Sequence, residues 1–290
     1  MYPSRFQYES PKTVAEAVAL LDQGAGEAKL LAGGQSLVPM LKLRFASPAM
    51  LVDINGIEEL RYHRFDSDGT LRIGALCRHE DLEKSDIIRQ KQPTISAAAP
   101  LVADPIVRTR GTFVGSVCHA DPQGDWAATM IALNGRIVAQ GPKGRREIAM
   151  KDFVLGPFQT ALEHNEIAIE AVIPAPQGVA VGGYIKLERR VGDFATASVA
   201  VALDVVGDKV VRAGIALGGV GSRTIDASDA AAALVGQPLT DATIAKAAEL
   251  AAAAAEPRSD HRGSADYKRH IVATFVSRLL NQIHSSKEAA

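Results

Sequence analysis

The sequence has few of the residues that build disulfide frameworks and metal clusters. Its 290 residues include two cysteines, Cys77 and Cys118, which are too few and too far apart for a disulfide framework or a cysteine-rich metal site. A four-cysteine iron–sulfur cluster cannot be built from this chain alone. We therefore expect both cysteines to be buried and reduced in a cytoplasmic protein, and we predict no metal ligands.

Charge imbalance and long apolar runs are also absent. The 32 basic residues nearly cancel the 33 acidic residues, which leaves a net charge of −1 without a long Lys/Arg run, so no nucleic-acid partner is expected. No apolar stretch approaches the roughly 20 residues that span a bilayer, so no transmembrane segment is predicted. The N-terminus lacks a charged segment followed by an apolar one, and we therefore expect no signal peptide.

Apolar residues are abundant enough for a packed core, at 47% of the chain. Short strands mixed with short helices predict an α+β or mixed α/β fold. The Pro-Ala-Pro-Gln-Gly segment at residues 174–178 is the best linker candidate, because proline and glycine interrupt regular structure. We therefore expect one domain at residues 1–177 and an α+β domain at residues 178–290.

Hydrophobic periodicity predicts individual elements along the chain. The first helix is expected to begin at Thr13, with Glu16 completing a capping box. A hairpin is expected across Gly207-Asp208, a turn pair that accepts positive φ. Helices are predicted at 13–21, 79–88, 230–234, 245–255 and 267–283, and strands at 29–32, 50–54, 71–75, 135–139, 146–149, 167–173, 198–206 and 209–217.

The first segment that could bind a ligand is Lys29-Leu-Leu-Ala-Gly-Gly-Gln-Ser-Leu37, an apolar strand that leads into two glycines. Without a Cβ, Gly33 and Gly34 let backbone N–H groups approach a phosphate closely, and Ser36 adds a hydroxyl donor. An ordinary surface turn explains the same pattern. The segment matches neither the Rossmann nor the P-loop glycine motif, so the residues alone leave both interpretations open.

The second segment, residues 108–126, holds the densest glycine and polar chemistry of the chain. Gly111 and Gly115 can bring the backbone close to a ligand. Thr112 and Ser116 offer neutral hydrogen bonds that suit a pyrophosphate or a ribityl chain. The segment is therefore a second candidate for nucleotide binding.

Other residues of the second segment allow different chemistry. Asp125 can accept hydrogen bonds from ribose or ribityl hydroxyls, or it can form a general acid/base pair with Asp121. On a strand, Cys118 and His119 would point to opposite faces, which is a poor arrangement for a nucleophile and its base. The two aspartates and His119 match no recognised metal-ligand spacing. Trp126 is expected to be a packing residue.

The third segment runs from Tyr184 to Ala195 and carries three cations and two anions within eight residues. On its own this pattern is typical of a solvated strand face. A lysine aimed at a flavin would have a different role, because a nearby ammonium stabilises the negative charge of the reduced ring and raises its potential.

Five segments follow one another in a specific order and spacing. They are Phe6-Gln-Tyr with Pro11, Ala32-Gly-Gly-Gln-Ser-Leu-Val-Pro-Met-Leu-Lys-Leu-Arg44, residues 110–122, Arg189-Arg-Val-Gly-Asp-Phe-Ala195 and Arg262-Gly-Ser-Ala-Asp-Tyr267. Together they resemble the FAD-binding medium subunit of molybdenum hydroxylases, the carbon monoxide dehydrogenase medium-subunit group, over essentially the whole chain. The same module is the flavin domain of xanthine dehydrogenase.

The resemblance implies an α+β fold and a set of cofactor-binding residues. A two-part FAD-binding domain of the vanillyl-alcohol-oxidase type, with subdomains at about 1–55 and 56–177, is followed by a smaller α+β C-terminal domain. Residues 29–37 resemble the first pyrophosphate loop, and residues 112–116 resemble the second, which also runs beside the isoalloxazine ring. Asp125 and Lys186 match family contacts to FAD. The implied FAD-binding residues are Lys29, Leu30, Leu31, Ala32, Gly33, Gly34, Gln35, Ser36, Leu37, Thr112, Phe113, Val114, Gly115, Ser116, Asp121, Asp125, Ala168 and Lys186.

The second loop departs from the family pattern at one position. The family usually has Thr-Ile-Gly-Gly, and this chain has Thr112-Phe-Val-Gly115, so Val114 replaces a glycine. A backbone torsion that needs glycine would not be available there. We expect FAD to bind with this loop altered locally.

The resemblance also implies an electron-transfer function. In this family a large subunit with a molybdopterin centre hydroxylates the substrate, and electrons cross two [2Fe–2S] clusters on a small subunit to reach FAD on the medium subunit. The medium subunit passes them to an external acceptor, and a dimer of heterotrimers is expected. Two alternatives stay open: a self-contained FAD-dependent oxidoreductase with its own substrate pocket, using Asp121 or His119 as base, and a non-enzymatic module that lost the cofactor.

Overall fold

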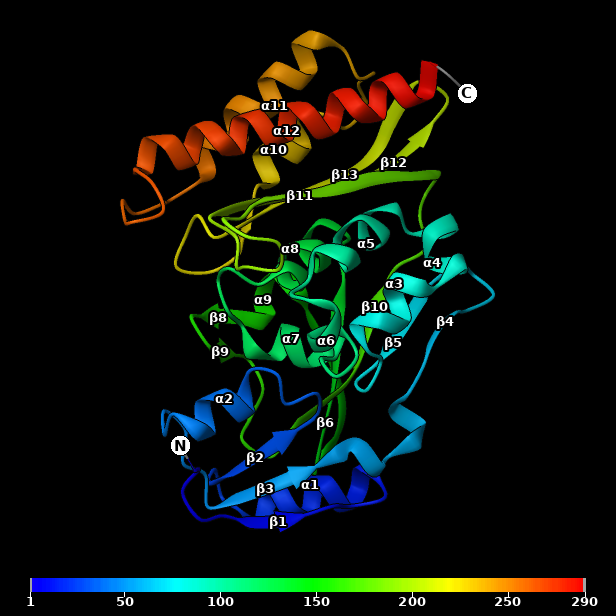
Figure 1. Cartoon of the computed structure of the whole chain (residues 1–290). Coiled ribbons are helices and arrows are strands. Elements are labelled where there is room, and N and C mark those ends of the chain that lie inside the picture. The colour runs from blue at the N-terminus through cyan, green and yellow to red at the C-terminus, as the bar shows by residue number, and fades with distance from the viewer. Residues whose placement is uncertain (1, 289–290) are drawn as a thin grey trace.

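The computed structural model describes residues 2–288, with side chains described for residues 2–285. Three layers follow one another along the molecule (Figure 1). The N-terminal layer comprises residues 2–53, the middle layer residues 54–173 and the C-terminal layer residues 179–288. Helices and mostly antiparallel strands alternate irregularly, so the predicted α+β class is confirmed.

The N-terminal layer is a three-stranded parallel sheet in the order β1-β3-β2, with strands β1 (Gln7–Glu9), β2 (Ala28–Leu31) and β3 (Met50–Asp53). Helix α1 (Val14–Gln23) begins with the predicted capping box, in which the Thr13 side chain accepts a hydrogen bond from Glu16 N. Its apolar face contributes to the core. Helix α2 (Leu37–Lys42) follows the first glycine pair.

The middle layer is built on a five-stranded antiparallel sheet. Its strands are β4 (His63–Phe65), β5 (Leu71–Gly74), β6 (Arg136–Gly141), β7 (Gly144–Ala149) and β10 (Ile167–Ile173), and a separate small hairpin contains β8 (Val154–Gly156) and β9 (Gln159–Thr160). The strand order is β4-β5-β10-β6-β7. The helices are α3 (His79–Lys84), α4 (Asp86–Lys91), α5 (Pro93–Ala98), α6 (Pro105–Arg108), α7 (Phe113–His119), α8 (Asp125–Ala132) and α9 (Met150–Phe153), with short 3-10 turns at Ile54–Gly56, Glu58–Leu60 and Ala99–Leu101.

Two predictions for the middle layer are wrong in detail. The helix expected over 79–88 is two helices, because Ser85 adopts an extended backbone and its side chain accepts a hydrogen bond from Ile88 N as the cap of α4. The segment 112–116 is not a loop, because Thr112 caps α7 and the next residues form its first turn. Cys118 and His119 consequently end a helix and do not lie on a strand.

The C-terminal layer is a four-stranded antiparallel sheet covered on one face by helices (Figure 1). Its elements are β11 (Val179–Leu187), β12 (Ala197–Val206), β13 (Lys209–Gly218), β14 (Ile225–Asp226), α10 (Ser228–Ala232), α11 (Asp241–Ala254) and α12 (Ala265–Glu288). The predicted β12–β13 hairpin is confirmed, and Gly207 has the positive φ, +61°, expected of its turn. In the described part of the chain, no helix combines the length and apolar character needed to cross a membrane.

Strand β12 is buried on both faces, and the two faces belong to different cores. Its odd-numbered residues from Ala197 to Val205 pack with the helices of the C-terminal layer. Ala200 and Ala202 join the core of the middle layer, together with Ala216 of β13. Because side chains alternate along a strand, this one sheet closes both cores.

The sheet face that meets the middle layer carries small residues. Gly182, Ala202 and Gly214 are paired across three neighbouring strands. A Cβ added at Gly214 would lie 1.9 Å from the carbonyl oxygen of Ala132, the last residue of α8. Helix α8 therefore packs directly on the sheet backbone, an approach that only glycine permits.

We predict that Gly214→Ala lowers the free energy of unfolding by about 1–3 kcal/mol, because the new methyl group must displace α8 from the sheet. Gly156→Ala is a matched control, since a Cβ there would meet only the Gln159 side chain, at 3.5 Å. Thermal denaturation followed by circular dichroism compares the two. Equal melting temperatures would show that the helix–sheet contact has room for a methyl group.

Candidate functional site

The two predicted glycine segments are in direct contact. A Cβ added at Gly33 would lie 2.5 Å from the carbonyl oxygen of Arg110 and 3.0 Å from the backbone nitrogen of Thr112. Any side chain at position 33 would therefore force the turn after β2 away from the start of α7. Backbone from two distant parts of the sequence forms one continuous surface here.

Unpaired backbone donors gather on this surface. Among the residues that the structure describes, none accepts a hydrogen bond from the backbone N–H of Gly33, Gly34, Gln35, Ser36 or Val114. These N–H groups lie in the first turn of a helix or just before one, where intrahelical acceptors are missing. A phosphate or pyrophosphate is the kind of ligand that such donors bind.

Asn55 and Arg78 connect the two segments through hydrogen bonds. Asn55 Nδ2 donates to the carbonyl oxygen of Ala32 at 2.8 Å, and Arg78 Nη2 donates to Asn55 Oδ1 at 2.7 Å. Arg78 Nη1 donates to the carbonyl oxygen of Arg110. Burial, together with the positive charges of Arg61 and Arg110, lowers the pKa of Arg78. Neither Asn55 nor Arg78 lies in a glycine motif, so only the fold places them beside the unpaired donors.

The second glycine segment rests on a buried histidine and tryptophan. His79 N donates to the carbonyl oxygen of Gly111 at 3.1 Å, and Trp126 Nε1 donates to His79 Nδ1 at 3.0 Å. Burial lowers the pKa of His79 to about 4, with a smaller effect from Arg108, so the ring is neutral and Nδ1 is free to accept. Trp126 is fully buried, which confirms that it is a packing residue.

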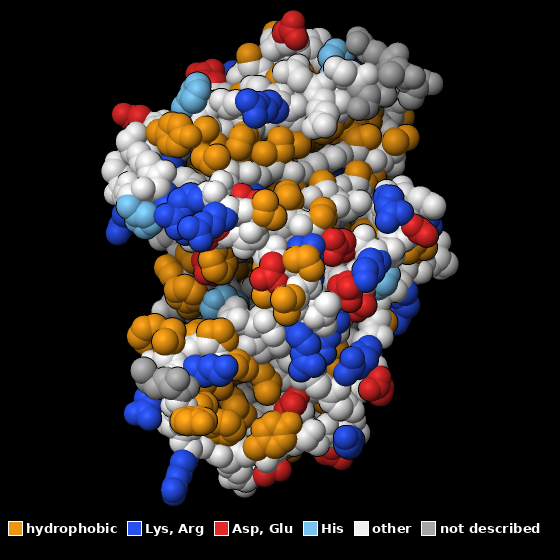
Figure 2. Space-filling model, in the orientation of Figure 1, with side chains coloured by type: hydrophobic (Ala, Val, Ile, Leu, Met, Phe, Trp, Pro, Cys, Tyr) orange, Lys and Arg blue, Asp and Glu red, His pale blue; other side chains and the backbone are white. Residues whose placement is uncertain are grey.

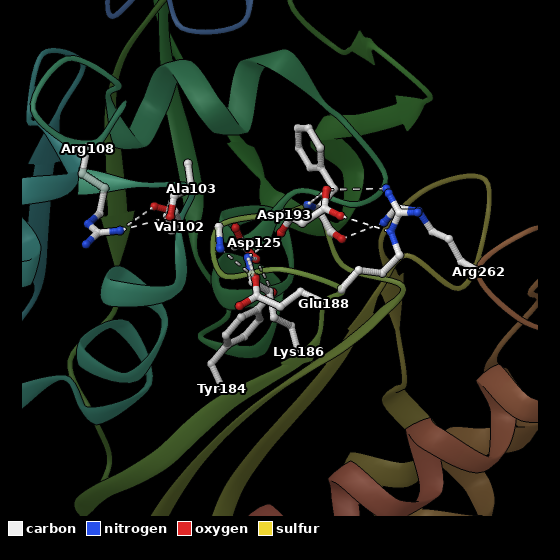
Figure 3. A network of polar contacts seen from close by, with 12 residues as sticks. Val102, Ala103, Arg108, Asp125, Tyr184, Lys186, Glu188, Asp193 and Arg262 are labelled. Atoms are coloured by element: carbon white, nitrogen blue, oxygen red, sulfur yellow. Dashed lines mark hydrogen bonds and ion pairs between the residues drawn. The ribbon is translucent and has the colours of Figure 1, made fainter. Parts of the chain in front are cut away.

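A second group of predicted residues meets at the start of α8. The Tyr184 hydroxyl donates to Asp125 Oδ1 at 2.7 Å, and Lys186 Nζ lies 3.3 Å from the same oxygen (Figure 3). Tyr184 and Lys186 share one face of β11 because they are two residues apart. Burial raises the pKa of Asp125, although the ammonium of Lys186 opposes the shift. Burial and the charge of Asp125 also raise the pKa of Tyr184, so the phenol keeps its proton.

Lys186 is enclosed, with 2% of its side chain exposed. Its ammonium has three oxygen neighbours: Asp125 Oδ1, Glu188 Oε2 at 3.3 Å and the carbonyl oxygen of Asp193 at 3.0 Å. Lys186 therefore does not lie on a solvated strand face. Three acceptors match the three donors of an ammonium group and fix its position.

The remaining predicted residues differ in what they can offer a ligand. Phe113 and Val114 have their side chains in the core, so only their backbone is available. Asp121 Oδ1 accepts a hydrogen bond at 2.9 Å from the backbone of its own turn. Ala168 lies beside a β-bulge in β10, the strand against which α7 packs. Lys29 and Gln35 are exposed; Thr112, Phe113, Val114, Asp125 and Ala168 are buried; Leu30, Leu31, Ala32, Gly33, Gly34, Ser36, Leu37, Gly115, Ser116, Asp121 and Lys186 are half-buried as whole residues.

The geometry disfavours the alternative chemistries of the second segment. Burial raises the pKa of Cys118 to about 12, which makes its thiol a poor nucleophile near neutral pH. The His119 ring packs against Phe158, with 5.2 Å between the ring centres. Cys77 is buried as predicted, whereas Cys118 is half-buried, and both are free thiols. Within residues 2–288, no cluster of His, Cys, Asp and Glu is placed to hold a metal ion.

We predict that Val114→Gly lowers the free energy of unfolding by about 3 kcal/mol and leaves FAD affinity unchanged. Val114 lies in the first turn of α7 without a positive φ, so its backbone does not need glycine. The glycine would remove a side chain that is 2% exposed and would weaken the helix.

Urea denaturation and a flavin fluorescence titration measure these two effects. Val114→Ala is the control, because alanine removes most of the side chain and keeps the helical preference. Tighter FAD binding by Val114→Gly would show instead that the valine restricts the site.

Family models match nearly the whole chain. The FAD binding domain in molybdopterin dehydrogenase matches residues 4–176, and the CO dehydrogenase flavoprotein C-terminal domain matches residues 183–283. The predicted architecture, an FAD-binding domain followed by a smaller C-terminal domain, is confirmed.

Individual proteins agree with the family models. The carbon monoxide dehydrogenase medium chain of Hydrogenophaga pseudoflava is 43% identical over 97% of this chain and 98% of its own length. The glyceraldehyde dehydrogenase medium chain of Sulfolobus acidocaldarius is 35% identical over 98% of this chain and 100% of its own length. A solved carbon monoxide dehydrogenase from Hydrogenophaga pseudoflava, lacking the Mo-pyranopterin moiety, matches with a TM-score of 0.94 and 44% identity, over 98% of this chain and 99% of that chain. The chain therefore belongs to the FAD-binding medium subunits of molybdenum hydroxylases.

Proposed function

We propose that this chain holds FAD across its two glycine segments and serves as the electron-transfer subunit of a molybdenum hydroxylase complex. The observation that carries the proposal is the contact of Gly33 with the backbone of residues 110–112, which joins unpaired N–H groups into one surface. Residues 29–37 and 112–116 would hold the pyrophosphate, with Ser36 and Ser116 as additional hydroxyl donors. The positive charge of Arg78 offsets part of the phosphate charge.

The flavin end of the cofactor is assigned to Asp125 and Lys186. When bound, FAD supplies the electron chemistry that no side chain of the protein can provide. The ammonium of Lys186 would stabilise negative charge on the reduced ring of bound FAD and so raise its potential. Asp121 and Ala168 complete the proposed set of contacts, and the chain divides into an FAD-binding domain at residues 1–177 and a C-terminal domain at residues 178–290.

Partner subunits are part of the same proposal. A small subunit with two [2Fe–2S] clusters supplies the electrons, a large molybdopterin subunit hydroxylates the substrate, and the complex is a cytoplasmic dimer of heterotrimers. The names of the relatives support this, because each is the medium chain of a dehydrogenase. Figure 2 shows hydrophobic side chains gathered on the face that carries α2 and the β8–β9 hairpin. Exposed members in these elements and the turns that follow them are Val38, Leu43, Phe45, Leu155 and Phe158, and such patches are typical of subunit contacts.

A self-contained FAD-dependent oxidoreductase is the alternative, and the geometry favours it less. That function needs a base directed at the flavin. His119 packs against Phe158, and Asp121 is hydrogen-bonded within its own turn.

We predict that Gly33→Ala weakens FAD binding at least tenfold, which is about 1.4 kcal/mol, because the new methyl group separates the two segments. Gly156→Ala is the control, because a Cβ there would meet only the Gln159 side chain. Isothermal titration of the apoprotein with FAD gives both dissociation constants. Unchanged affinity of the Gly33 variant would place the pyrophosphate elsewhere.

The electron-transfer role has a separate prediction. The FAD-loaded chain alone is expected to remain oxidised when mixed anaerobically with candidate substrates of the complex, and to become reduced once the partner subunits are added. Flavin absorbance follows the reaction. Reduction by a substrate without partners would support the self-contained enzyme.

A further inference from the structure

The connection between β11 and β12, residues 188–196, supplies the carbonyl group that fixes Lys186. Lys186 Nζ donates to the carbonyl oxygen of Asp193 at 3.0 Å, a shorter distance than the 3.3 Å to Asp125 or to Glu188. The Asp193–Phe194 peptide therefore determines where the ammonium lies between the two carboxylates.

Arg262, in the turn before α12, holds the next peptide group, Phe194–Ala195, and the Asp193 side chain (Figure 3). Its Nη1 donates to the carbonyl oxygen of Phe194 at 2.7 Å, and its Nη2 lies 3.7 Å from Asp193 Oδ1. Only 12% of the Arg262 side chain is exposed. The guanidinium thus contacts the Phe194 carbonyl, one residue after the Asp193 carbonyl that accepts from Lys186.

The turn that carries Arg262 has a fixed conformation of its own. Arg262 N donates to Asp260 Oδ1 at 2.8 Å. The nearly buried Lys268 donates to Asp260 Oδ2 at 2.7 Å and to the carbonyl oxygen of Arg258 at 2.9 Å. The hydrogen bond from Lys268 is the main reason that the pKa of Asp260 is lowered. Hydrogen bonds from Arg262 and Lys268 to Asp260 therefore fix the turn that carries Arg262.

The middle layer supports the loop from a second direction. A Cβ added at Gly192 would lie 2.7 Å from the carbonyl oxygen of Ala103. That carbonyl accepts from Arg108 Nη1 at 3.2 Å, and Arg108 also forms an ion pair with Glu83 at 2.7 Å. The loop is thus held at Gly192 by the middle layer and at Phe194 by Arg262.

We propose that Arg262 is a positioning residue for Lys186 and, through Lys186, sets the redox potential of the bound FAD. This inference rests on the proposed function, because Lys186 acts on the flavin only if FAD lies beside Asp125. Without Arg262, the Phe194 carbonyl and the Asp193 carboxylate lose a partner, the adjacent Asp193 carbonyl is no longer fixed, and Lys186 loses its shortest contact. The ammonium then keeps only the carboxylates of Asp125 and Glu188, and its field at the flavin falls.

The test is the midpoint potential of FAD in the loaded full-length chain, measured by equilibration with a reference dye. For Arg262→Gln we expect the ratio of reduced to oxidised FAD at a fixed ambient potential to fall about tenfold, which for a two-electron couple is about 30 mV. Arg262→Lys keeps the charge and one donor, so its shift should be smaller and in the same direction.

Two comparisons separate positioning from a simple loss of charge. Arg190→Gln removes an equal charge from the same loop, where the exposed Arg190 side chain makes no ion pair within the described chain, and it should leave the potential nearly unchanged. In a Lys186→Met background, Arg262→Gln should cause no further shift, because residues that act through one another are not additive.

The outcomes distinguish the inference from the proposed function. No shift in Lys186→Met contradicts the placement of Lys186 at the flavin, and with it the proposed function. A shift in Lys186→Met without one in Arg262→Gln overturns the inference alone. Additive shifts in the double variant also overturn it, because Arg262 would then act by its own charge. If Arg262→Gln does not fold, Arg262→Lys provides the same comparison, and an unshifted potential there counts against positioning.

Discussion

Helix α8 lies across a sheet face of small residues, and charged side chains from that sheet hold both of its ends. At the first turn, Asp125 contacts Tyr184 and Lys186 of β11. At the last turn, Arg212 Nη1 donates to the carbonyl oxygen of Ala132 at 3.1 Å while its Nε donates to Asp204. Glycine and alanine set the distance between helix and sheet, and the charges set the direction of the helix. The candidate binding site for the flavin end of FAD forms only where α8 meets the C-terminal sheet.

Burying Lys186 in this contact costs several kcal/mol of solvation, and its attraction to carboxylates offsets that cost only in favourable geometry. Replacing a buried ion pair by hydrophobic residues of similar volume is often neutral or stabilising in proteins. The structure nevertheless surrounds the ammonium with Asp125, Glu188 and the Asp193 carbonyl. Such an arrangement is better explained by a charge that must be held at one place than by stability, which agrees with a role beside a redox cofactor.

Local sequence patterns predicted the elements well where local forces decide them. The capping box at Thr13 and the hairpin at Gly207 need only neighbouring residues. Helix α7 could not be predicted in this way, since it contains one glycine and two valines, which favour helices weakly. The packing of α7 against β10, and of its Phe113 ring against Trp126, overrides that preference.

The candidate site shows the same limit more clearly. Glycine spacing identified both backbone segments, because the absence of a side chain is visible in the sequence. Their contact at Gly33 depends on the packing of two layers, and the bridge through Asn55 and Arg78 depends on that contact. Lys186 was ambiguous for a related reason: alternation along a strand says that charges share a face, but it does not say whether water or another layer covers that face.

The two domains of the sequence share one of the two hydrophobic cores. Residues 174–178 separate two stretches of sequence, yet Tyr184, Ala200, Ala202 and Ala216 belong to the core of the middle layer. A fragment that ended at the linker would leave α8 without the sheet on which it packs and Asp125 without its partners. The FAD-binding part thus relies on the C-terminal domain for both its apolar closure and its buried cation. This dependence explains in physical terms how residues as distant as Asp125, Lys186 and Arg262 can act as one network.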